Sequence, residues 1–182
     1  MKLFSGYIDA GSMLKQYWCA YGGIKALALS PYFHLSLLFL ALSVSWRNGF
    51  GWVNDALSVV PSILGFSIGA FAIFLALADE KFVNVLTMKN LGPATSKTSA
   101  HLKISALFIH FMIIQVLAIL IALSSRSIEN LEQMNLLAKF VSGTGYFFFI
   151  YSIFTAVAVS LNLLRLALLF NKFKVSQDEA NN

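Results

Sequence analysis

Four long apolar stretches, each free of Asp, Glu, Lys and Arg, dominate the hydrophobic pattern of this chain. They contain 21, 23, 22 and 25 residues and cover positions 26–46, 56–78, 104–125 and 140–164. A helix needs roughly 20 apolar residues to cross a hydrocarbon core about 30 Å thick. Because water is absent there, the backbone must satisfy its own hydrogen bonds, and a helix does so. The pattern predicts an all-α polytopic membrane protein, a bundle of four transmembrane helices with short interfacial helices.

Shorter segments surround these predicted spans, and 1–182 reads as a single membrane domain. Residues 1–25 repeat apolar aromatics at helical spacing and predict a cytoplasmic helix lying in the interface. Ser30-Pro31 resembles a helix start, so the first span can begin near Pro31 and be short. Gly143 and Gly145 are expected to interrupt the chain before the fourth span. The remaining segments are a cytoplasmic loop at 79–103, a fourth helix that continues through 140–170, and a cytoplasmic tail at 171–182.

The distribution of positive charge predicts the orientation of the spans. The N-terminal segment, the 79–103 loop and the C-terminal end carry ten of the 13 Lys and Arg residues. Because cytoplasmic loops are enriched in Lys and Arg, both termini and this loop are expected in the cytoplasm. The net charge of +5 is then explained by topology and anionic lipid, without a direct nucleic-acid partner. The chain lacks an Asn-x-Ser/Thr sequon, which fits a bacterial inner membrane.

Small residues recur along one side of the second span, at alternating steps of four and three. This small-residue stripe consists of Ser58, Ser62, Gly65, Gly69, Ala72 and Ala76. It runs out to Asp55 at one end and Asp79 at the other. Such a stripe lets two helices approach closely, either within one bundle or between subunits. If copies surround an axis, the stripe can instead line a pore with acids at both mouths. Four spans alone seldom enclose a pore, so that interpretation requires a homo-oligomer.

The polar residues of the spans do not form a pattern typical of catalysis. His34, His101 and His110 lack the converging partners that a metal site needs. No nucleophile stands beside a base, so no catalytic, cofactor or metal site is expected. His110 and Gln115 lie deeper and are expected to hydrogen-bond neighbouring helices, with a proton or ion path as the alternative.

A small polar group is expected at the inner ends of the second and fourth spans. Arg165, with Asn162 one turn away, can extend to the interface or face Asp79 or Glu80. All four lie at a similar predicted depth, which makes an ion pair between the two spans a hypothesis.

The layout resembles small four-span membrane proteins of bacterial phage-exclusion systems: the Rex exclusion membrane protein and, by architecture, the Kiwa membrane subunit. The resemblance covers the hydropathy layout and the small-residue second span with its charged exit, positions 62–81. It implies an oligomeric inner-membrane component that senses infection or perturbs the membrane. Channel activity is attributed to the Rex type and partner recruitment to the Kiwa type.

Two functions are therefore expected. The first is a membrane sensor or scaffold in anti-phage defence that docks a cytoplasmic protein through the 79–103 loop and the C-terminal end. The alternative is a cation-conducting oligomer that depolarises the membrane.

Overall fold

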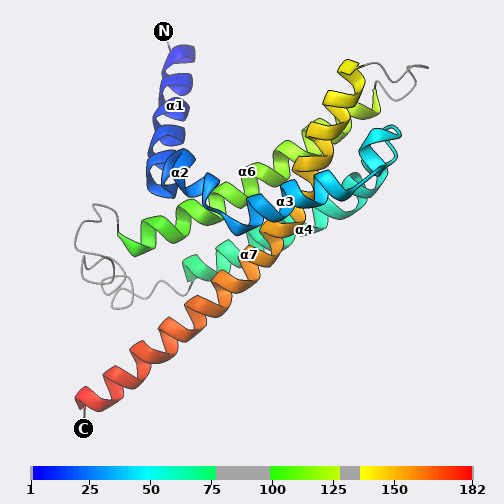
Figure 1. Ribbon diagram of the computed structural model, residues 1–182. Helices are drawn as coiled ribbons and strands as arrows, with labels where there is room; N and C mark the ends of the chain where they lie inside the picture. The colour runs from blue at the N-terminus through cyan, green and yellow to red at the C-terminus, as the bar shows by residue number, and fades with distance from the viewer. Residues whose placement is uncertain (1, 77–98, 128–135, 182) are drawn as a thin grey trace.

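The computed structural model describes residues 2–76, 99–127 and 136–181, and helices make up nearly all of them. The helices are α1 (Lys2–Tyr21), α2 (Gly23–Ala28), α3 (Pro31–Leu42), the 3-10 helix η1 (Ser45–Arg47), α4 (Trp52–Ala76), α6 (Ala100–Arg126) and α7 (Leu136–Asn181). The helices α3, α4, α6 and α7 form an elongated bundle, from which the N-terminal end of α1 stands away (Figure 1). The all-α prediction is confirmed for this part of the chain.

Three helices, α4, α6 and α7, are long and apolar enough to cross a membrane. They match the predicted second, third and fourth spans. The predicted first span differs, because 26–46 is not one helix. Its longest piece, α3, has 12 residues and is about 18 Å long at 1.5 Å per residue. The described part of the chain thus has three helices that could span a membrane, as in a membrane protein, and the count of four spans is not confirmed.

Pro31 and two side chains that follow the helix, Trp46 and Arg47, explain why α3 is short. Pro31 begins α3 and favours an extended conformation at Ser30, which has φ −71° and ψ 122°. At the other end, Trp46 Nε1 donates to the Leu40 carbonyl at 2.8 Å. Arg47 Nη2 donates to the Ala41 carbonyl at 3.2 Å. Both bonds satisfy carbonyls that a longer helix would have paired internally.

The core lies where α4, α6 and α7 meet, and it consists of two apolar clusters. One cluster surrounds Trp52 and includes Val60, Ala118 and Phe149. The other surrounds Phe74 and includes Phe108, Ala158 and Leu166. We call the corresponding ends of the bundle the Trp52 end and the Phe74 end. By the predicted orientation, the Phe74 end faces the cytoplasm.

Glycines of α7 have a different role from the one expected. Gly143 and Gly145 do not interrupt the chain, because α7 is one helix of 46 residues that runs through both. A Cβ on Gly143 would lie 3.1 Å from Trp46 Cε3, and one on Gly145 would lie 2.5 Å from Trp52 Cζ2. These two glycines therefore make room for the tryptophan rings at the Trp52 end. The helix also continues through most of the predicted tail.

Candidate functional site

His110 joins three helices at one buried point. Its side chain lies on α6 and is only 2% exposed. Its Nδ1 lies 2.7 Å from the Tyr17 hydroxyl of α1, and its Nε2 lies 3.1 Å from the Tyr151 hydroxyl of α7. A neutral imidazole has one donor and one acceptor nitrogen, so one tyrosine donates and the other accepts. We call this arrangement the Tyr17–His110–Tyr151 bridge.

Stacked rings reinforce the bridge. The Tyr21 ring lies 4.0 Å from the His110 ring, centroid to centroid, at an interplanar angle of 20°. Burial raises the pKa of Tyr17 to about 12, and its neighbour Tyr21 adds to the rise. Burial also raises the pKa of Tyr21. Tyr17 and Tyr21 are therefore neutral at physiological pH, and both contact the bundle as uncharged side chains.

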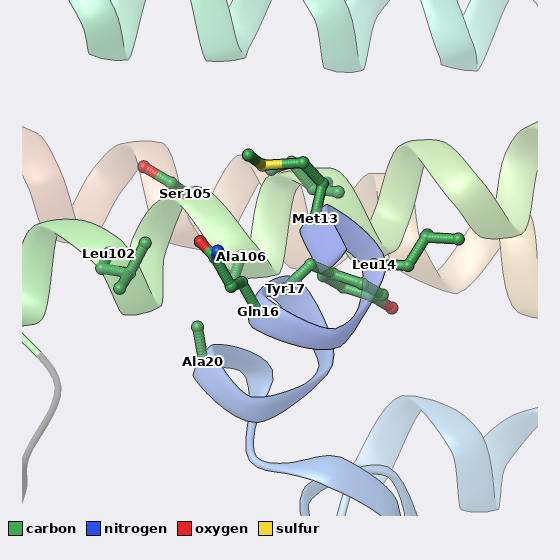
Figure 2. Close-up of a pocket in the computed structure, with 9 residues that line it drawn as sticks. Met13, Leu14, Gln16, Tyr17, Ala20, Leu102, Ser105 and Ala106 are labelled. Carbon is green, nitrogen blue, oxygen red and sulfur yellow. The ribbon is translucent and has the colours of Figure 1, made fainter. Parts of the chain in front are cut away.

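A groove of about 260 Å³ opens between α1 and α6 next to the bridge. Figure 2 shows side chains of both helices facing this space. The groove is lined by Met13, Leu14, Gln16, Tyr17, Ala20, Leu102, Ser105, Ala106 and Ile109. Tyr17 belongs to both features, since its ring forms a wall of the groove and its hydroxyl bonds His110. The groove and the bridge therefore form one site, which positions α1.

A second polar cluster lies in the middle of the bundle. Gln115 Nε2 donates to Ser67 Oγ at 2.9 Å and to Thr155 Oγ1 at 3.1 Å. The three side chains come from α6, α4 and α7, and all are fully buried. The expectation that His110 and Gln115 hydrogen-bond neighbouring helices is thus confirmed. A proton or ion path through them stays a prediction.

The small-residue stripe faces outward. All six of its members are exposed, and a Cβ added at Gly65 or Gly69 would meet nothing within 4 Å. The opposite face of α4 packs into the bundle, with Val60, Ser67 and Ala70 among its buried residues. The prediction that the stripe packs against another helix within one bundle is therefore wrong. The buried face of α4 combines large side chains, such as Trp52 and Phe74, with small ones, such as Ala70. Contact between copies and the lining of a pore stay predictions.

The charged and polar residues predicted at the helix ends do not form one site. Asp55 is exposed in the first turn of α4. Asn162 Nδ2 donates to the Ala158 carbonyl of its own helix at 2.9 Å, and Arg165 is exposed. Asp79 and Glu80 lie outside the described residues, so their pairing with Arg165 stays a prediction.

The other two histidines stand apart from His110. His34 is exposed on α3. His101 packs against Phe74, with the ring centroids 5.0 Å apart. Among the residues that the structure describes, no three His, Cys, Asp or Glu side chains gather as they would to hold a metal ion.

Sequence reasoning missed the tyrosine partners of His110. Tyr17 and Tyr21 are four residues apart, which places them on one face of α1. That spacing was a usable signal that α1 has a contact face. It did not indicate that the contact is a buried histidine on α6, nor that Tyr151 would join it.

Comparisons of the chain with protein families, with curated proteins and with solved structures find no match.

Proposed function

We propose that this protein is a homo-oligomeric membrane scaffold or sensor that holds a cytoplasmic protein at the bilayer. The observation that carries the proposal is the length of α7. Its 46 residues make a helix about 69 Å long at 1.5 Å per residue. That is more than twice the roughly 30 Å of a hydrocarbon core. A helix of this length has room to cross the membrane and to present several further turns to a partner.

The surface chemistry of the C-terminal turns of α7 supports a docking role. Lys172, Lys174, Asp178 and Glu179 are exposed there. Val175 is 50% exposed among them. A mixed charged surface with an apolar residue suits specific recognition of a soluble protein, because charge patterns select the partner and its orientation.

The small-residue stripe supports self-association. Gly65 and Gly69 have open space outside them, so another helix can approach the α4 backbone closely. Within a membrane, such close packing is a main source of helix association. A second copy of α4 supplies a matching stripe, and each protomer would then present its own α7 extension on the same side.

The cellular setting follows from charge and resemblance. The concentration of Lys and Arg at the termini and in the 79–103 loop supports a bacterial inner-membrane protein with the α7 extension in the cytoplasm. The resemblance to phage-exclusion membrane proteins supports a role in anti-phage defence, with infection as the signal.

A cation-conducting oligomer is the second candidate, and the outward stripe favours it. If several copies turned this face toward a common axis, Asp55 would form a ring of carboxylates at one mouth. Such rings favour cations. The two candidates share the stripe as a contact or lining surface and differ in whether the assembled protein conducts.

A pair of experiments on the purified protein tests the proposal. Planar-bilayer recordings should show no cation current, and affinity capture should recover one soluble protein encoded beside this chain. The double variant Lys172→Glu/Lys174→Glu should lose that protein, whereas Lys139→Glu near the opposite end of α7 should retain it. A current that Asp55→Asn reduces would instead support the pore. If the Lys172→Glu/Lys174→Glu variant still captured the soluble protein, docking at the C-terminal extension of α7 would be contradicted.

A further inference from the structure

We propose that the groove between α1 and α6 binds an acyl chain of an anionic phospholipid, and that the bound lipid holds α1 against the bundle. This goes beyond the scaffold function and requires only that the protein resides in a bilayer.

The lining suits a hydrocarbon chain. Met13, Leu14 and Leu102 form exposed apolar walls at 62%, 58% and 50% exposure. Ala20 and Ala106 also line the groove and add small apolar side chains to it (Figure 2). An apolar ligand that fills such a hollow buries these exposed apolar side chains, which is favourable. The groove begins at the end of α6 that carries Lys103 and follows its first charge-free turns. In a bilayer, the neighbouring molecules at this depth are lipid acyl chains.

The charges near the groove favour an anionic head group. Lys15 on α1 and Lys103 on α6 belong to the two helices that form the groove, and Lys25 follows on α2. Asp9 is the acid in the described part of these three helices. A cluster of lysines beside a membrane surface attracts anionic lipids. Gln16 and Ser105 place polar side chains on the groove, where they can meet the ester region of the same lipid (Figure 2).

The geometry also explains how the lipid would affect α1. Residues 6–16 of α1 are exposed, so the helix contacts the bundle mainly through its C-terminal turns. Tyr17 is a wall of the groove and a partner of His110. An acyl chain in the groove would therefore pack against the Tyr17 ring, which holds α1 against the bundle. Removal of the lipid would leave α1 restrained by the Tyr17–His110 bond and the stacking of Tyr21 on His110.

Native mass spectrometry of the full chain, released from nanodiscs of phosphatidylcholine and phosphatidylglycerol, tests the proposal. The wild-type protein should retain phosphatidylglycerol in preference to phosphatidylcholine. Ala106→Leu, which fills the groove, should lose both lipids, whereas Ala167→Leu on the exposed side of α7 should retain them. Lys15→Gln/Lys103→Gln should lower the preference by about fivefold for each lysine, the equivalent of about 1 kcal/mol per charge.

A distance measurement tests the effect on α1 without relying on retained lipid. Spin labels at Ile8→Cys and Leu168→Cys, in a Cys19→Ser background, report the separation of α1 and α7. Phosphatidylglycerol should narrow the distance distribution in the otherwise wild-type protein and have no effect with Ala106→Leu. The lysine variant leaves the core unchanged, so it tests the charge even if Ala106→Leu folds poorly. Equal retention of both lipids by the wild type, unchanged retention with Ala106→Leu, or a distribution insensitive to lipid would overturn the proposal.

Discussion

The ring of Trp52 lies directly against Gly145. A Cβ at position 145 would fall 2.5 Å from Trp52 Cζ2 and 3.0 Å from Ile121 Cγ2. Trp52 is only 2% exposed, and its Nε1 donates to Ser142 Oγ at 3.0 Å. Ser142 Oγ in turn donates to the Gly49 carbonyl at 2.7 Å. The glycine that brings two helices together thus lies on α7, and α4 contributes the large ring.

Gly145→Ala should destabilise the protein. The added methyl group overlaps a buried indole that is held by a hydrogen bond, and such overpacking costs about 1–3 kcal/mol. Unfolding in detergent, followed by tryptophan fluorescence, measures the loss. Gly69→Ala is the matched control, because space is open there and Ala favours a helix by up to about 1 kcal/mol. Equal stability of Gly145→Ala and Gly69→Ala would contradict the assigned contact.

Gly65→Leu and Gly69→Leu should reduce self-association and leave each protomer folded. Both side chains would point into open space within one chain, so their bulk acts only on a neighbouring copy. Light scattering of the detergent-solubilised protein reports the mass of the assembly. Ile73→Leu keeps an exposed apolar residue on α4 outside the stripe and should leave the mass unchanged. An oligomer that survives both glycine substitutions would exclude the stripe as its contact.

His110→Phe should release α1. The substitution keeps an aromatic ring for Tyr21 but removes both hydrogen bonds of the Tyr17–His110–Tyr151 bridge. Hydrogen bonds between membrane helices are worth about 0.6 kcal/mol each on average, so the bundle should persist while α1 exchanges faster. Amide hydrogen exchange of residues 13–21 provides the measurement. His34→Phe, at an exposed site on α3, should not change exchange in α1; faster exchange in both variants would indicate a nonspecific effect.

The attachment of α1 should weaken at high pH. Burial raises the pKa of Tyr17 from 10.0 to about 12, so the attached state favours the neutral phenol. The stabilisation is complete below pH 10, the usual pKa, and is lost as pH rises toward 12. Hydrogen exchange in α1, corrected for its intrinsic dependence on pH, should therefore show loosening above pH 10. Tyr17→Phe, which cannot ionise, should flatten this part of the profile; the same loosening in Tyr17→Phe would assign it to another group.

Hydropathy predicted the existence of α4, α6 and α7 because the preference of a long apolar helix for lipid depends on that helix alone. The same reasoning overestimated the length of the helix within 26–46. Its residues are apolar enough, but Pro31 starts a new helix there, and Trp46 and Arg47 cap its carbonyls from outside. Local signals at Ser30-Pro31 indicated the break, whereas the caps depend on how the chain folds back.

The role of each glycine and histidine depended on the tertiary structure. Gly65, Gly69 and Gly145 all lie in apolar helices, yet only Gly145 faces a large ring within the chain. In a membrane helix both the buried and the lipid-facing sides are apolar, so periodicity does not distinguish inside from outside. His110 was recognisable as a buried polar group in need of partners. Sequence alone thus determined which segments prefer lipid, since that is a property of composition; only packing determined which faces meet, since that depends on the neighbours each helix finds.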